Sequence, residues 1–171
     1  LKYDGNGATG SGQTISGLNF QPDMTWIKST NTTDGHSVQD VVRGFGSTTK
    51  LSTYDNSQEN DSGGGSYENY GYISAATSDG FTVVAGSNPG QANKSGNNYV
   101  SWNWKAGGTA SSNTDGTITA SVSANQTAGF SIIEFTGTEA TGSVGHGLNK
   151  TPTCFIMKRF TDDGYSSTSE F

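Results

Sequence analysis

The feature that most limits what this chain can fold into is a turn motif that occurs twice. Residues 17–28 (GLNFQPDMTWIK) return as residues 147–158 (GLNKTPTCFIMK), with Gly, Leu, Asn, Pro and Lys at matching places. The offset is about 130 residues, which is longer than a solenoid repeat and close to the size of a whole domain. The sequence therefore predicts one module followed by the beginning of a second copy.

The segments around the two motifs set the expected domain boundaries. Residues 133–137 (IEFTG) resemble residues 1–5 (LKYDG) in pattern and in distance from the turn motif, whereas residues 117–123 have no counterpart in the first copy. We expect a first module over residues 1–107 that lacks its first strand, and a truncated second copy over residues 108–171. The chain is accordingly expected to be a stretch of a longer protein.

The composition favours an all-β fold. Of the 171 residues, 25 are Gly, and only 14% are charged, against about 25% in typical soluble domains. Hydrophobic residues make up 30%, so the core must be thin and must rely on aromatic side chains. Frequent Gly turns between short β-prone segments predict an antiparallel protein with many short strands, and no window has the periodicity of a long helix.

Strands are expected wherever short β-prone segments lie between turn residues. The Asp-Gly pair at residues 79–80 lies between alternating segments and predicts a hairpin. The expected strands are residues 12–17, 23–29, 36–44, 48–54, 70–77, 81–85, 99–105, 117–123, 130–135 and 154–157, with a linker at residues 106–113.

The distribution of charged and apolar residues argues against two classes of protein. The formal net charge is −6, and the nine Lys and Arg residues are scattered, whereas a nucleic-acid groove needs clustered cations. No apolar run approaches about 18 residues, so no membrane insertion is expected. The single cysteine, Cys154, lies in an apolar run and is expected to be a small buried hydrophobe in a central strand, with no disulfide framework within the chain.

The order of the segments resembles a module of bacteriophage structural proteins. The residues that carry this resemblance are 17–28, 36–44, 78–82 and 99–108, followed by 129–133 and 145–148 at the start of the next repeat. They are similar to the concanavalin A-like, jelly-roll repeats of phage tail-fibre and other virion-appendage proteins, especially those of marine phages. The resemblance covers nearly the whole chain and departs at residues 30–35 and in the tyrosine-rich stretch at 67–72.

The resemblance implies a β-sandwich of the jelly-roll type and a structural function. The expected protein is a repeat of a virion appendage, such as a tail fibre, that presents or spaces a host-receptor-binding surface. Its location would be the virion surface or the extracellular space, and its partners would be other virion proteins and further copies of itself in a homo-oligomer. The alternative is a carbohydrate-binding module, on a phage or a secreted bacterial protein, with a host cell-surface glycan as its ligand.

Four aromatic residues form the candidate ligand surface. Tyr67, Tyr70 and Tyr72 follow a Gly-rich loop among polar residues, and tyrosine gives contact area at a low entropy cost. Trp26 could stack on the apolar face of a sugar. The competing interpretation is partial burial in strands and loops for the three tyrosines, and core packing for Trp26.

The other two tryptophans are expected to be structural. Trp102 and Trp104 alternate along one strand and share a face with Val100, which predicts the apolar, core-facing side of an amphipathic strand. A sugar-stacking platform built from the same residues is the alternative interpretation.

His36, Asp40 and Arg43 lie close together and invite a catalytic interpretation. On a strand, however, the His and Asp share one face and can hydrogen-bond each other or the adjoining loop, and the Arg suits a structural ion pair. No nucleophile motif is present, and a glycoside hydrolase would need two carboxyl groups about 5–10 Å apart. Glu134 and Glu139 lack the i, i+2 spacing for such a pair, so we expect no enzyme activity.

Three loop carboxylates offer oxygen donors for a metal. Asp55, Glu59 and Asp61 could hold calcium, but the EF-hand spacing is absent, and solvated loop side chains are the simpler interpretation. No cofactor is expected.

Overall fold

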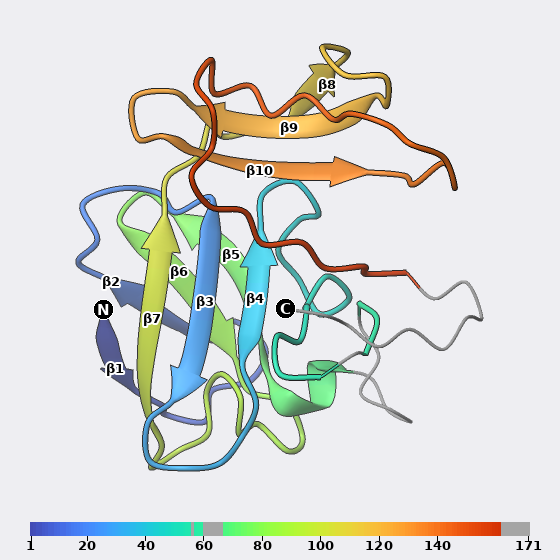
Figure 1. Ribbon diagram of the computed structural model, residues 1–171. Coiled ribbons are helices and arrows are strands. Elements are labelled where there is room, and N and C mark those ends of the chain that lie inside the picture. The colour runs from blue at the N-terminus through green and yellow to red at the C-terminus, as the bar shows by residue number, and fades with distance from the viewer. Residues whose placement is uncertain (56, 60–66, 162–171) are drawn as a thin grey trace.

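The computed structural model describes residues 1–55, 57–59 and 67–161 (Figure 1). In this part of the chain the regular structure is almost entirely β, with one 3₁₀ turn, η1. No described helix is long and apolar enough to cross a membrane. The elements are β1 (Lys2–Asp4), β2 (Gln13–Ser16), β3 (Met24–Ser29), β4 (Ser37–Asp40), η1 (Tyr67–Tyr70), β5 (Tyr72–Thr77), β6 (Gly80–Val84), β7 (Asn98–Trp104), β8 (Ser111–Asn113), β9 (Ala120–Asn125) and β10 (Phe130–Phe135).

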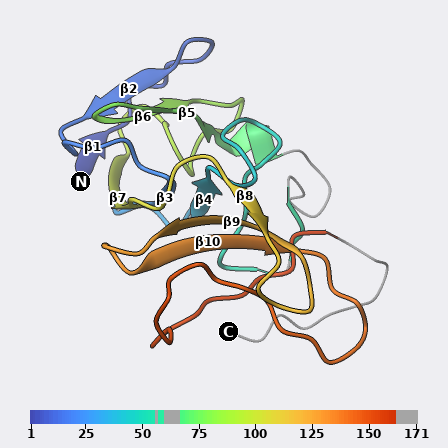
Figure 2. The same cartoon turned by 90° about the horizontal axis from the view of Figure 1, so that it is seen from above.

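Two antiparallel sheets face each other and form a β-sandwich, as the sequence predicts (Figures 1 and 2). Sheet A has the strand order β1-β7-β3-β4, and sheet B has the order β2-β6-β5. The predicted hairpin is confirmed, since β5 and β6 pair on either side of Ser78 and Asp79. Strands that are distant in the sequence thus become neighbours, and the central pair of sheet A is β3 with β7.

The core lies between sheets A and B and is small and aromatic. Tyr3 stacks on Tyr99 with ring centroids 5.0 Å apart and meets Phe81 edge-on at 6.0 Å. The two tyrosine hydroxyls donate to the carbonyl oxygens of Ala92 (2.6 Å) and Gly90 (2.9 Å). The cluster is completed by Ile15, Ile27, Ile73 and Val83. These hydroxyls let tyrosine fill an apolar interior without leaving a polar atom unpaired.

The prediction of which face of β7 is buried is wrong. Tyr99 and Ser101 point into the core, whereas Trp102 is 47% exposed and Trp104 is half-buried on the outer face. The predicted alternation along the strand is confirmed, but both faces carry aromatic residues, and alternation alone does not say which set is inside. The Tyr99 ring fills the core because its hydroxyl reaches the loop at residues 89–90.

A third sheet, C, lies against one end of sheet A. It has the order β10-β9-β8 and is seen above the sandwich in Figure 1 and on the outer side of sheet A in Figure 2. The Trp104 ring stacks on Phe130 at 5.8 Å, and the Ser123 hydroxyl donates to the Gly108 carbonyl at 2.6 Å. The predicted linker at residues 106–113 is therefore too long, because β8 already belongs to sheet C.

The asparagine of the repeated turn has a left-handed backbone in both copies, but only the first copy is followed by a strand. Asn19 and Asn149 both have left-handed φ values, 61° and 57°. In the first copy β3 follows the turn, whereas residues 154–157 form no strand. Cys154 is exposed there, so its predicted burial is wrong.

The reason for this difference is the neighbours available to each segment. β3 pairs with β7 on one side and β4 on the other, and both partners come from distant parts of the chain. Within the described residues, 154–157 have no such partner strands, and Phe155, Ile156 and Met157 are 84%, 73% and 66% exposed. Strand formation at this sequence depends on the partner strands rather than on local propensity.

Two further predicted strands differ from the structure. β4 ends at Asp40, and a turn follows it, because the Asp40 carboxylate accepts hydrogen bonds from the next backbone N–H groups. The segment at residues 48–54 is irregular and contacts the sheet through one bridge between Leu51 and Val38.

Gln39 joins the two sheets through its side chain. It is fully buried in β4; its Nε2 donates to the Gly46 carbonyl, and its Oε1 accepts from the Ile73 N–H of β5, each at 2.6 Å. Gly46 and Ile73 also share a backbone hydrogen bond of 3.0 Å. This side of the sandwich is therefore closed by polar contacts.

We predict that Gln39→Met lowers the free energy of unfolding by about 2–4 kcal/mol, because it leaves the buried Ile73 N–H and Gly46 carbonyl without this partner. The measurement is urea unfolding followed by tryptophan fluorescence. Gln126→Met on the surface is the matched control and should change stability by less than about 0.5 kcal/mol. Equal effects of the two substitutions would contradict the assigned role.

Candidate binding face

The outer face of sheet A carries a row of aromatic side chains. Trp26 of β3 and Trp102 of β7 are directly opposite in the strand register, and their rings meet edge-on with centroids 6.0 Å apart. Trp26 is half-buried, whereas Trp102 is 47% exposed. The pairing of β3 with β7 therefore creates a two-ring surface from residues 76 positions apart in the chain.

His36 extends the row and fixes the orientation of Trp26. The Trp26 Nε1–H donates to His36 Nδ1 at 2.9 Å, so Nδ1 must be unprotonated. Partial burial, and then the positive charge of Lys28, lower the pKa of His36 and favour this neutral form. The indole is thus held by a hydrogen bond that weakens on acidification.

Tyr54 ends the row on the other side of the histidine. Its ring centroid lies 6.3 Å from that of His36, and its side chain is 48% exposed. The Tyr54 hydroxyl accepts a hydrogen bond from Gln91 Nε2 at 3.0 Å. Nothing in the local sequence marks Tyr54, because its position depends on a loop that returns to the edge of β4; sequence reasoning therefore missed it.

The structure describes only part of the predicted tyrosine surface. Tyr70 and Tyr72 are half-buried, in η1 and β5, and the side chain of Tyr67 lies outside the described residues. The Tyr70 ring lies 5.8 Å from the ammonium of Lys50. Of the candidate ligand residues whose side chains are described, Trp26 alone joins the exposed aromatic row, and its partner there is Trp102.

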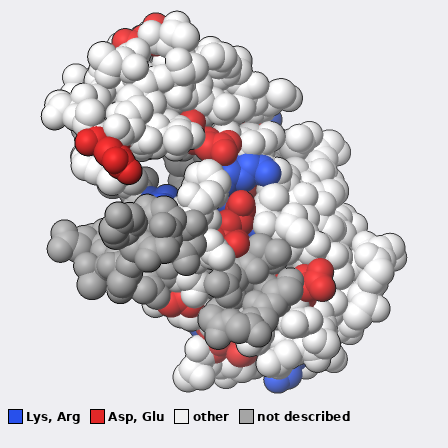
Figure 3. Space-filling model, turned by 90° about the vertical axis from the view of Figure 1, so that its right-hand side faces the viewer, with Lys and Arg blue, Asp and Glu red and all other residues white. Residues whose placement is uncertain are grey.

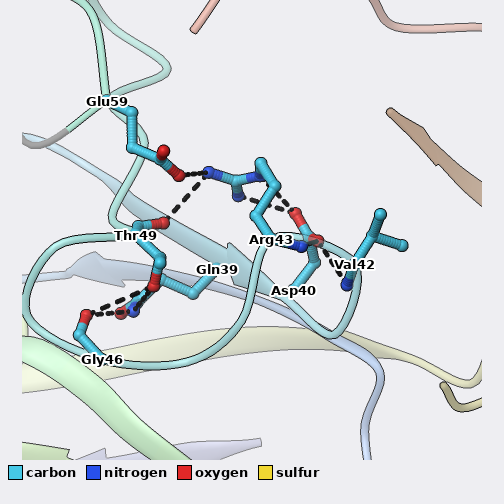
Figure 4. A network of polar contacts seen from close by, with 7 residues as sticks. All are labelled: Gln39, Asp40, Val42, Arg43, Gly46, Thr49 and Glu59. Atoms are coloured by element: carbon cyan, nitrogen blue, oxygen red, sulfur yellow. Dashed lines mark hydrogen bonds and ion pairs between the residues drawn. The ribbon is translucent and has the colours of Figure 1, made fainter. Parts of the chain in front are cut away.

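The polar residues after β4 form a closed ion-pair network (Figure 4). The Arg43 guanidinium contacts the Asp40 carboxylate at 2.6 Å and the Glu59 carboxylate at 2.7 Å. Its Nη1 also donates to the Thr49 carbonyl at 3.0 Å. Burial raises the pKa of Glu59, and Arg43 opposes this rise. Because Arg43 and Asp40 are nearly buried, the network stabilises the loop and offers little surface to a substrate.

His36 and Asp40 do not meet, although they share a segment. His36 lies before β4 and bonds Trp26, whereas both Asp40 oxygens bond the turn and Arg43. Glu134 lies half-buried in β10, and Glu139 lies beyond its end in left-handed backbone.

The proposed calcium donors are engaged in other contacts where the structure describes them. Asp55 accepts from the Ser57 N–H at 3.1 Å, and Glu59 binds Arg43. Asp61 lies outside the described residues. Among the residues that are described, no group of three His, Cys, Asp or Glu side chains is placed to hold a metal ion.

Lys50, which the sequence did not single out, has the largest pKa shift among the described basic side chains. Lys50 is fully buried, and its ammonium donates to the Gly71 carbonyl at 3.1 Å. Burial lowers the pKa of Lys50 to about 7, against the opposing effect of Asp55. A perturbed lysine can mark an active site. Here it lies inside the sandwich, and its hydrogen bond ties the loop after β4 to the start of β5.

Charged side chains are dispersed on the face seen in Figure 3, with Lys and Arg as isolated spots among Asp and Glu. The described residues on this face form no continuous basic stripe of the kind that nucleic acids require. The exposed side chains that stand out on sheet A are those of the aromatic row.

Comparison with known families gives one match. A family model described as a domain of unknown function (DUF7483) matches residues 1–168. No curated protein and no solved structure matches the chain.

We predict that Lys50 makes stability rise with pH between about 7 and 10. The pKa of Lys50 is about 7 when folded and 10.5 when unfolded, so between these values the unfolded chain binds one more proton. The free energy of unfolding should rise by up to about 1.4 kcal/mol per pH unit and be flat below pH 7 with respect to this group. The measurement is urea unfolding at pH 7.0, 8.0 and 9.0.

Lys50→Met removes the titrating group and serves as the comparison. Taking the difference in stability between the wild type and this variant cancels the contributions of all other titrating groups. This difference should change with pH. A difference that is constant from pH 7 to 9 would contradict the assignment.

Proposed function

The chain belongs to this family of unknown function (DUF7483), and we propose that it is a structural β-sandwich repeat of a bacteriophage virion appendage, such as a tail fibre. It would present or space a host-receptor-binding surface at the outside of the virion. Its partners would be other virion proteins and further copies of itself.

Three observations support this proposal. The turn motif recurs with the same left-handed Asn in both copies, which fits a protein built from repeats of one unit. The segment order also resembles phage appendage modules of the jelly-roll type. The buried charges contribute to holding loops in place, as the contacts of Arg43 and Lys50 illustrate, and this suits a rigid spacer.

We predict that antibodies raised against the purified protein label intact phage particles. The experiment is immunogold electron microscopy of virions from the phage whose genome carries the gene, with mass spectrometry of the same particles. Gold at fibres or other appendages supports the proposal. Detection of the protein only in infected cells and not in purified particles would overturn it.

A second function, carbohydrate binding, is favoured by one observation: the exposed Trp102 ring beside Trp26. Aromatic faces pack against the apolar face of sugars, and the His36 hydrogen bond holds Trp26 in place for such packing. Weak sites of this kind bind more tightly when many copies are displayed. Once one copy has bound, the others meet the ligand at a high effective concentration.

We predict that Trp102→Ala abolishes any glycan binding while leaving the fold intact. The measurement is a glycan array with the wild-type protein, followed by titration of the glycans that bind. Phe135→Ala is the matched control, since Phe135 is an exposed aromatic residue at the end of β10. Absence of glycan binding by the wild type, or binding that survives Trp102→Ala, would exclude a sugar site at this face.

A further inference from the structure

The outer face of sheet A carries a row of N–H donors next to its aromatic row. Val100 of β7 pairs with Lys2 of β1 on one side and with Lys28 of β3 on the other, so the two lysines lie in one line across neighbouring strands (Figure 1). Alternation along β1 and β3 directs both lysines to the outer face. The pairing of β3 with β4 then places His36 next to Lys28. We call Lys2, Lys28 and His36 the donor row.

Lys28 is a half-buried cation without a counter-charge. Its ammonium donates to the carbonyl oxygens of Ser29 at 2.6 Å and Thr32 at 3.0 Å. An ammonium has three N–H donors, and no described residue accepts the third. No described carboxylate forms an ion pair with Lys28, whereas Arg43 and Lys105 each have such a partner. The carbonyl oxygens thus hold a positive charge at the surface where an anionic group can reach it.

His36 supplies a second donor in a defined tautomer. Its Nδ1 accepts from the Trp26 Nε1–H at 2.9 Å, so the neutral ring carries its proton on Nε2. No described residue accepts from this Nε2–H. The His36 ring lies between those of Trp26 and Tyr54, with centroid distances of 5.7 and 6.3 Å. Trp26 therefore leaves one N–H donor in the middle of the aromatic row.

The acidic residue of the adjoining loop does not neutralise this site. Asp34 accepts a hydrogen bond from Thr32 Oγ1 at 2.6 Å, and its carboxyl group packs against Gly90. The formal net charge of −6 belongs to the whole chain, and charges more than about 8 Å apart are largely screened at physiological ionic strength. The local charge of Lys28 therefore favours an anion in spite of the net charge.

The groove on the other side of Trp102 lacks such donors. It lies at the edge of β7 and has a volume of about 330 Å³, and Leu18, Phe20 and Trp104 form part of its lining. No charged side chain lines this groove. A polar ligand therefore finds its partners on the Lys28 side of the aromatic row.

We propose that the outer face of sheet A binds an acidic saccharide, built from uronic or sialic acid units. The apolar face of a sugar ring packs on the indoles of Trp26 and Trp102. The carboxylate of the sugar accepts hydrogen bonds from the third N–H of Lys28 and from the Nε2–H of His36. This inference rests on the proposed carbohydrate binding and names the class of sugar.

The geometry of sheet A fits such a ligand. Trp26 and Lys28 are two residues apart on one face of β3, which is about 7 Å along a strand. A pyranose ring with its carboxylate bridges a separation of this size. Lys2 lies further along the donor row, within reach of the acid group of a neighbouring sugar unit. An acidic peptide is a poorer fit, because β3 and β7 are central strands and offer no free backbone edge at the face.

The test is isothermal titration calorimetry with oligosaccharides of galacturonic, glucuronic, mannuronic and sialic acid, each compared with its methyl ester. The ester keeps the sugar backbone and removes the charge. We expect the acid that binds to do so at least tenfold more tightly than its ester, because hydrogen bonds between charged groups are stronger than neutral ones. This preference should decline as salt is added. Lys28→Met should abolish the preference and leave the affinity for the ester unchanged, whereas Lys28→Arg should retain it.

Lys150→Met is the matched control, because it removes one positive charge from an exposed side chain in the second copy of the turn motif. It should leave the preference for the acid unchanged. Equal binding of acids and esters by the wild type would overturn this inference alone and leave carbohydrate binding standing. Binding of none of these saccharides would overturn both.

Two further results would also overturn the inference. One is a preference for the acid that survives Lys28→Met. The other is binding of a triglutamate peptide with the same dependence on Lys28, which would assign the site to an acidic peptide. The indole N–H signals of Trp26 and Trp102 locate the site in the wild type by NMR, whether or not Lys28→Met folds. If neither signal moves when the acid is added, the ligand does not lie on this face.

Discussion

The pairing of β7 with β3 is the constraint on which the rest of the structure depends. It brings residues 24–29 beside residues 99–104 and sets the register of sheet A. Through alternation it then sends Tyr99 and Ser101 into the sandwich and the tryptophans to the outer face. The Tyr99 ring supports Tyr3 and thereby β1, while the Trp104 ring supports sheet C through Phe130. The core, the aromatic row and the third sheet all follow from one register.

A chain with so few hydrophobic residues must complete its interior with polar groups. Gln39, Lys50 and Arg43 lie at three places along one side of the sandwich, and each bonds backbone carbonyls of loops. Buried polar groups are tolerated when their hydrogen bonds are satisfied, and they then order the loops that they contact. The cost of burying Lys50 is visible in its pKa of about 7.

The sequence predicts local structure well and tertiary placement poorly, and the repeated turn shows why. The asparagine of Gly-Leu-Asn adopts left-handed backbone in both copies, although the contacts of the two turns differ. The following segment becomes a strand only next to β4 and β7, so the apolar run at residues 154–157 was a misleading signal. The hairpin at residues 79–80 was predictable for the same reason as the turn. The buried face of β7 was not, since alternation defines two faces without saying which one meets the other sheet.

For the candidate site, sequence patterns identified Trp26 but not its environment. Trp102 and His36 become its neighbours through the β3–β7 register and a side-chain hydrogen bond, and Tyr54 joins through a returning loop. Contacts of this kind depend on long-range pairing, which a single sequence does not display. The same holds for Arg43, whose partner Glu59 comes from a segment without periodicity.

Trp102 links the face of sheet A to its edge. Its ring meets Trp26 on the face and lines the groove beside Leu18 and Phe20 at the edge. One indole thus belongs both to the aromatic row and to the wall of the groove. A substitution at Trp102 therefore alters both surfaces at once.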